Sequence, residues 1–155
     1  MSRPLVLGIG NLLMGDEGVG VHAVWQMEGT LPPNVSLLDG GTGGFQLLGE
    51  LTGHDPVFMI DATMDGQPAG TVAVLRPRYA SDFPRSLTAH DIGLRDLIEA
   101  AALLGHLPHV TLITVSISEV TSMRTTLSPA VEAAIPAVRA LVDTLVAGET
   151  AVACA

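Results

Sequence analysis

The stretch that most constrains this chain is its first eighteen residues, in which a short apolar run leads through a glycine-rich turn to a pair of acids. Residues 5–9 are apolar apart from Gly8, a pattern typical of a strand covered on both faces. Asp16 and Glu17 follow a Gly-Asn turn, and Asp16 is placed to cap a helix predicted over residues 16–28. Strand, turn and helix in this order predict the opening of an α/β fold.

The loop before this helix does not match the common nucleotide-binding signatures. A dinucleotide fingerprint needs Gly-x-Gly-x-x-Gly, and Leu13 occupies the position of the third glycine. A P-loop needs a lysine, and the sequence contains none. Helix capping is the simplest role for the two acids, but one carboxylate is enough for a cap. The second acid, Glu17, is then available for chemistry.

The composition predicts a single domain over residues 1–147, followed by a frayed tail over residues 148–155. The chain has 155 residues, 48% of them apolar, which is enough to build a core. Its net charge of −9 argues against nucleic acid or an anionic membrane as partner. The single cysteine, Cys154, gives no disulfide framework, and we find neither a signal-peptide pattern nor a membrane-length apolar run. These features favour a cytoplasmic protein.

Further apolar and β-branched runs predict the remaining strands, over residues 35–38, 57–60, 70–76 and 109–118. The strand over 70–76 follows its predecessor too closely for a helical crossover, so it is expected to be antiparallel at a sheet edge. Further helices are predicted from Phe45, from Thr88 and from Ser128, with Pro129 in the first position of the last one and a kink at Pro136. The sheet is therefore expected to be mixed.

Carboxylates and histidines are the side chains that remain for chemistry after other catalytic patterns are excluded. The sequence has no Gly-x-Ser-x-Gly elbow, no His-Glu-x-x-His helix and no aspartic-protease motif. Glu17 and Asp61 follow strands expected to be parallel, which places both at one edge of the sheet, and His90 can reach that edge from its predicted helix. Two carboxylates and an imidazole can bind a divalent metal. Capping and loop-bonding roles for the acids, with His90 on the surface, are the alternative.

A second glycine-rich stretch, Asp39-Gly40-Gly41-Thr42-Gly43-Gly44, follows the second strand. Its backbone amides could hold an anion or a peptide backbone, and a tight strand-to-helix turn explains the glycines equally well. The other histidines fall on a helix face, in a polar turn or in a connection, and we expect them to be structural: His22, His54, His106 and His109.

Four blocks of this sequence resemble, in order and roughly in spacing, the hydrogenase maturation endopeptidases. These are nickel-dependent proteases that trim the C-terminus of the large subunit of nickel-iron hydrogenases. The blocks are Gly8-Ile9-Gly10-Asn11-Leu12-Leu13 through Asp16-Glu17, Asp39-Gly40-Gly41-Thr42-Gly43, Asp61-Ala62, and His90 with Gly93-Leu94. The likeness as a whole covers nearly the whole chain.

The resemblance implies a single-domain, three-layer α/β fold with a mixed, mostly parallel five-stranded sheet and helices on both faces. It assigns Glu17, Asp61 and His90 as the nickel-contacting catalytic residues, and Asp16 could share the role of Glu17. It also implies that nickel arrives with the substrate, as the centre already inserted in the precursor.

We therefore expect an endopeptidase that removes the C-terminal extension of the nickel-loaded large-subunit precursor. Asp39, Gly40, Gly41, Thr42 and Gly43 are expected to hold this extension as backbone. Two other classes of function stay open. One is a nickel-sensing or metal-delivery module that binds the same precursor without cleaving it, and the other is a small flavodoxin-like or phosphate-binding domain that uses the glycine loops.

Overall fold

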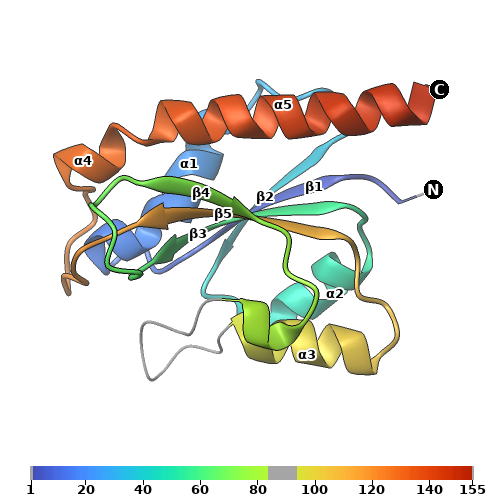
Figure 1. Ribbon diagram of the computed structural model, residues 1–155, viewed down its shortest axis with the longest axis horizontal. Helices are drawn as coiled ribbons and strands as arrows, with labels where there is room; N and C mark the ends of the chain where they lie inside the picture. The colour runs from blue at the N-terminus through green and yellow to red at the C-terminus, as the bar shows by residue number, and fades with distance from the viewer. Residues whose placement is uncertain (1, 84–93, 155) are drawn as a thin grey trace.

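Five strands form one mixed sheet at the centre of the molecule (Figure 1). The computed structural model describes residues 2–83 and 94–154. The strands are β1 (Leu5–Ile9), β2 (Ser36–Gly41), β3 (Val57–Thr63), β4 (Val72–Leu75) and β5 (Val110–Ser116). Their order in the sheet is β2-β1-β3-β5-β4; β4 pairs antiparallel with β5 at one edge, and the other pairs are parallel. The predicted five-stranded, mostly parallel sheet is confirmed, and so is its antiparallel edge strand.

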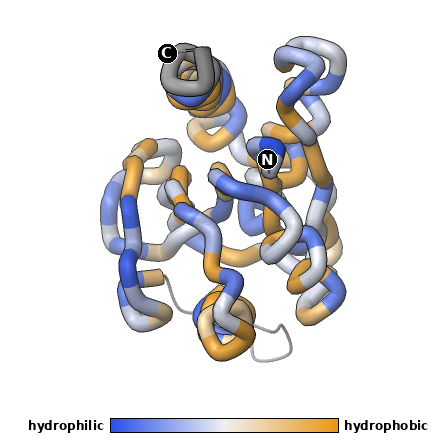
Figure 2. Tube along the Cα trace, turned by 90° about the vertical axis from the view of Figure 1, so that its right-hand side faces the viewer, coloured by the Kyte–Doolittle hydropathy of each residue, from blue (hydrophilic) through white to orange (hydrophobic). Residues whose placement is uncertain are grey.

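Helices cover both faces of this sheet (Figure 1). One face is covered by α1 (Val19–Met27) and α5 (Ile135–Cys154), and the other by α2 (Leu47–Thr52) and α3 (Leu94–Leu103). The view turned by 90° shows α5 and the helices of the other face on opposite sides of the strands (Figure 2). Because successive side chains of a strand point to opposite faces of the sheet, a strand can contribute side chains to the cores on both faces. Val6, Phe58 and Ile113 belong to the first core, and Leu7, Met59 and Leu112 to the second.

The start of α1 lies unusually close to the sheet because two glycines make room for it. A Cβ atom on Gly20 would come within 2.3 Å of the Ile60 carbonyl oxygen and 2.4 Å of the Ile9 carbonyl oxygen. A Cβ atom on Gly8 would lie 2.3 Å from the Gly20 carbonyl oxygen. Glycine at both positions therefore allows α1 to pack closely against the ends of β1 and β3.

The first helix begins later than the sequence predicts. Residues Gly15–Gly18 form a short 3-10 helix, η1, and α1 follows with Gly18 at its N-cap and no capping bond from a side chain. The prediction that Asp16 caps the first helix is therefore wrong. The carboxylate of Asp16 bonds to Ser128 instead.

The C-terminal region contains two helices where the sequence predicts one kinked helix. Ser128 is the N-cap of α4 (Pro129–Glu132) and Pro129 stands in its first turn, as predicted. The helix then breaks, and α5 begins at Ile135, so Pro136 lies in a first turn where its missing N–H costs no helical hydrogen bond. α5 runs through Cys154, so the predicted boundary between domain and tail at residue 148 falls inside this helix.

The predicted helix start at Thr88 lies outside the described residues. Within residues 2–83 and 94–154, no helix combines the length and the apolar character needed to span a bilayer.

Candidate functional site

Glu17 and Asp61 lie at the end of the sheet that is formed by the carboxyl ends of the parallel strands. Asp61 belongs to the last residues of β3, and Glu17 belongs to η1, which contacts β3. β1 and β3 are parallel neighbours, with Gly8 opposite Ile60, so the segments that follow these residues emerge side by side. The structure therefore places two of the three residues predicted for a metal-binding site on neighbouring elements, where the parallel strands end.

Each of these carboxylates accepts a hydrogen bond from a backbone N–H. The Asn11 N–H donates to Glu17 Oε2 at 3.1 Å, and the Ala62 N–H donates to Asp61 Oδ1 at 2.8 Å. Glu17 is buried, with 7% of its surface exposed, and Asp61 is half-buried. Hydrogen bonds from N–H groups to carboxylates are charge-assisted, so they orient both side chains.

The turn before Glu17 needs glycine at position 10. Gly10 has φ +148°, and a Cβ atom there would meet the Glu17 carbonyl oxygen at 2.2 Å. Gly10 therefore allows the backbone of Glu17 to lie close to the end of β1.

His90, the third predicted nickel-contacting residue, lies outside the described residues. Among the residues that the structure describes, no cluster of three or more His, Cys, Asp or Glu side chains could hold a metal ion. The ligand set Glu17, Asp61 and His90 thus stays a prediction.

The Asp16 carboxylate bonds to Ser128 at the start of α4, 112 residues further along the chain. Its Oδ1 accepts from the Ser128 N–H at 2.7 Å, and its Oδ2 accepts from the Ser128 hydroxyl at 2.7 Å. Only 8% of the Asp16 surface is exposed. Because both carboxylate oxygens are engaged in a buried contact, Asp16 is suited to a structural role. For this reason we do not assign Asp16 a share in the role of Glu17.

Replacing Asp16 by Ala is expected to lower the free energy of unfolding by about 2–4 kcal/mol, because two hydrogen bonds to a buried carboxylate are lost. Urea unfolding of Asp16→Ala, Ser128→Ala and the double variant measures this effect. The two substitutions should not add, and their coupling should be about 1–3 kcal/mol. Additive effects would show that the two side chains do not stabilise the fold together.

The glycine-rich stretch 39–44, whose first three residues form the end of β2, is held from both sides. Asp39 Oδ1 accepts from the Gly41 N–H at 3.0 Å, and Asp39 Oδ2 accepts from the Trp25 indole N–H at 2.9 Å. The Gly10 N–H donates to the Gly41 carbonyl oxygen at 3.0 Å. The two glycine-rich stretches are therefore bonded to each other, and Asp39 orients the loop through its own side chain.

A pocket of about 240 Å3 lies between these two glycine-rich stretches. Asn11 and Leu12 line one side of it, Gly41 and Thr42 another, and Trp25 and Asp39 complete the wall. It is smaller than the roughly 300–1,000 Å3 of pockets for drug-sized ligands, so it suits one or two residues of an extended peptide. A larger hollow, of about 800 Å3, is lined by Arg76, Leu145 and neighbouring residues, and none of the predicted site residues contributes to it.

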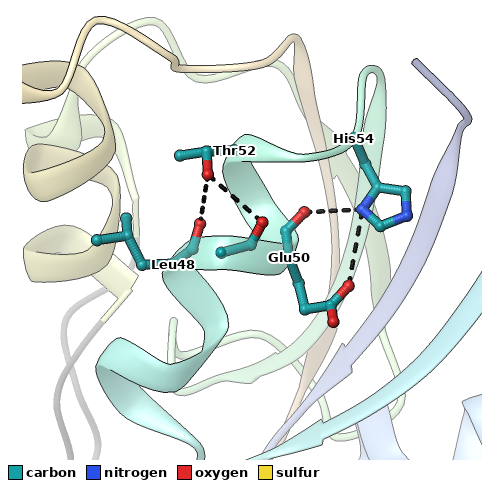
Figure 3. A network of polar contacts seen from close by, with 5 residues as sticks. Leu48, Glu50, Thr52 and His54 are labelled. Atoms are coloured by element: carbon teal, nitrogen blue, oxygen red, sulfur yellow. Dashed lines mark hydrogen bonds and ion pairs between the residues drawn. The ribbon is translucent and has the colours of Figure 1, made fainter.

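Three of the remaining histidines make contacts that suit structural roles. His54 Nδ1 lies 2.8 Å from the Glu50 carbonyl oxygen at the end of α2, where Thr52 also donates its hydroxyl to Leu48 (Figure 3). His109 Nδ1 lies 3.2 Å from Asp55 Oδ1. This pair precedes the start of β5, so it lies at the end of the sheet opposite to Glu17 and Asp61. The His22 ring packs edge-on against Trp25, with ring centroids 5.7 Å apart.

Sequence reasoning missed three partners of the predicted site residues, namely Asn11, Trp25 and Ser128. Asn11 stands in the Gly-Asn turn, so its backbone contact with Glu17 had a local signal. Trp25 is 14 residues from Asp39, and Ser128 is 112 residues from Asp16, so no sequence spacing links these pairs.

The fold and the site define an α/β protein with two acidic residues, Glu17 and Asp61, where parallel strands end. The family model for hydrogenase maturation proteases, HycI, matches residues 21–144. The hydrogenase 2 maturation protease of Escherichia coli is 36% identical over 137 residues, which are 86% of this chain and 84% of that protein. The hydrogenase expression/formation protein HupD of Rhodobacter capsulatus is 40% identical over 84% of this chain, which spans 64% of that longer protein.

The solved structures that this chain resembles include hydrogenase maturation peptidases as well. The hydrogenase maturating endopeptidase HybD of E. coli superimposes with a TM-score of 0.80 at 36% identity, covering 92% of this chain and 91% of that one. A hydrogenase 2 maturation peptidase from a Thaumarchaeota archaeon superimposes with a TM-score of 0.70 at 32% identity, covering 90% of this chain and 95% of the other. This chain belongs to the hydrogenase maturation protease family.

Proposed function

We propose that this chain is an endopeptidase that removes the C-terminal extension from the nickel-loaded large-subunit precursor of a nickel-iron hydrogenase. The observation that carries the proposal is the position of Glu17 and Asp61, two backbone-held carboxylates where the parallel strands end. Asn11, whose N–H bonds to Glu17, also lines a small pocket. The family membership supports it, since the relatives include proteins named as maturation proteases and endopeptidases.

In this proposal nickel belongs to the substrate. Carboxylate oxygens and an imidazole nitrogen are ligands that divalent transition metals accept, so the donor types fit a nickel centre carried by the precursor. Glu17, Asp61 and His90 would hold it. A metal in this position would polarise the carbonyl group of the scissile bond.

The side chains of the site would carry out the hydrolysis. The extension lies along the backbone of Gly41 and Thr42, with a residue in the pocket between Asn11 and Trp25. Either Glu17 or Asp61 accepts a proton from a water molecule while the water oxygen bonds to the scissile carbonyl carbon. The carbon–nitrogen bond then breaks, and the carboxyl group returns the proton to the departing amine. Asp16 takes no part, because both of its oxygens bond to Ser128.

The proposed partner is thus the large-subunit precursor, and neither nucleic acid nor a membrane is part of the proposal. The net charge of −9 agrees with this choice. We place the reaction in the cytoplasm, because a chain with a single cysteine has no disulfide framework and suits a reducing compartment.

The proposal is tested by incubating the chain with its precursor in nickel-loaded and nickel-free forms and following the shortening of the precursor on a gel. We expect the nickel-loaded form to be shortened and the nickel-free form to stay intact. Equal cleavage of both forms would remove nickel from the proposal. A stable complex with the nickel-loaded form and no cleavage would favour a sensing or metal-delivery module.

A further inference from the structure

Large apolar side chains are exposed on each of the segments that follow the parallel strands. The segment after β1 exposes Leu13 (52%), the one after β2 Phe45 (54%), the one after β3 Met64 (49%) and the one after β5 Met123 (84%). Single exposed apolar residues are ordinary on protein surfaces. Their gathering at the edge that carries Glu17 and Asp61 needs a second observation before it indicates a binding surface.

Met123 supplies that observation through its backbone. Its φ is +59°, the left-handed region that glycine adopts readily and that costs energy for a residue with a Cβ atom. It is the one non-glycine residue with positive φ among the residues that the structure describes. A strained residue persists where the surrounding structure holds it, and such residues cluster at active and binding sites. An 84% exposed methionine has no packing role in the isolated chain that would explain this.

The backbone around Met123 is fixed to the loop that carries Glu17. The Arg124 N–H donates to the Leu13 carbonyl oxygen at 3.0 Å, and the Gly15 N–H donates to the Arg124 carbonyl oxygen at 2.7 Å. The two bonds between Asp16 and Ser128 join the same two segments a few residues further on. Leu13 and Met123, which we call the apolar ridge, therefore stand on a rigid pair of loops.

We propose that the apolar ridge docks the folded body of the large-subunit precursor, next to the point where its C-terminal extension begins. This inference rests on the proposed function. The ridge is continuous with the site, because only three residues separate Leu13 from Glu17 in the chain, so a folded client whose scissile bond reaches Glu17 would come against the ridge. The extension itself is assigned to the glycine-rich loop at the β2 side. The ridge carries no charge, so its partner is an apolar patch on the client's surface.

Met123→Gly separates docking from folding. Glycine suits the left-handed backbone, so the melting temperature should stay the same or rise. Removing the side chain should raise the Kd for the nickel-loaded precursor by about tenfold, which is the loss expected for an apolar side chain at the centre of an interface. Biolayer interferometry with the immobilised chain measures the Kd, and mass spectrometry follows cleavage separately. Met123→Leu, which keeps an apolar side chain, should restore most of the affinity.

Leu103→Ser is the matched control. Leu103 is 83% exposed at the end of α3, near the opposite edge of the sheet, and its replacement should leave the Kd unchanged. Equal affinity of Met123→Gly and the wild type would overturn the inference. So would a change in self-association, measured by light scattering, without a change in precursor affinity, because the ridge would then bind a second copy. Binding without cleavage by the wild type would contradict the proposed function alone.

Discussion

Replacing Glu17 by Gln is expected to slow cleavage of the nickel-loaded precursor by at least about 100-fold. Gln has the same shape and can still accept the Asn11 N–H through its amide oxygen, so the loop should keep its structure. What is lost is the negative charge, which the site needs either to hold the substrate's metal or to accept a proton from water. Initial rates of product formation, with the melting temperature measured in parallel, check this result.

Asp61→Asn should show a comparable loss, and Asp16→Asn serves as the control. Asn at position 16 can still accept the Ser128 N–H, so this variant should cleave the precursor at a rate within a few-fold of the wild type. If Asp16→Asn were inactive and Glu17→Gln active, with both variants folded, the catalytic role would belong to Asp16.

Gly20→Ala is expected to have the largest effect on the fold, with a loss of about 3 kcal/mol or more in the free energy of unfolding. The new methyl group would lie 2.3 Å from the Ile60 carbonyl oxygen and 2.4 Å from the Ile9 carbonyl oxygen. Neither backbone atom can move without disturbing the sheet, so α1 must shift away from it. Since η1 leads directly into α1, Glu17 should move as well, and cleavage should fall further than the loss of folded protein explains. Urea unfolding and the rate per folded molecule measure the two effects.

Gly49→Ala is the matched control for this substitution. Gly49 is exposed in α2, and a Cβ atom there would meet no other atom within 4 Å. Alanine favours helix more than glycine, so this variant should gain about 0.5–1 kcal/mol in stability and keep its activity. A Gly20→Ala variant as stable as the wild type would show that the close approach of α1 to the sheet is not needed.

The sheet could be predicted from the sequence because the signals of its strands are local. The runs around Leu7, Met59 and Leu112 are apolar over the length of a buried strand, and these residues are fully buried in the structure. The short link before β4 was enough to predict its antiparallel pairing. The position of Glu17 and Asp61 at one edge follows from the parallel pairing of β1 and β3.

The contacts that hold the site together could not be predicted, because they join distant residues. Asp16 looked like a helix cap, since an acid before an apolar stripe is typical of one. The actual partner of Asp16 is Ser128, which the sequence predicts as the start of the last helix. In the structure the Ser128 hydroxyl donates to Asp16 and makes no capping bond within its own helix. Likewise Trp25, which lies 14 residues before Asp39 in the sequence, donates its indole N–H to Asp39.

The break between α4 and α5 was missed for a different reason. A proline inside a helical pattern predicts a kink, but a proline in the first turn of a new helix has the same sequence context. The residues around Pro136 give no local signal that separates the two cases. The role of His90 stays a prediction from the sequence.

The most direct test of the central claim is the intact mass of the nickel-loaded precursor and its products after incubation with the wild-type chain. The account predicts a shortened large subunit and one released C-terminal peptide, whose masses add up to that of the precursor plus one water, and no products with Asp61→Asn. An unchanged precursor mass in the presence of a demonstrable complex would contradict the account, and so would full cleavage by Asp61→Asn.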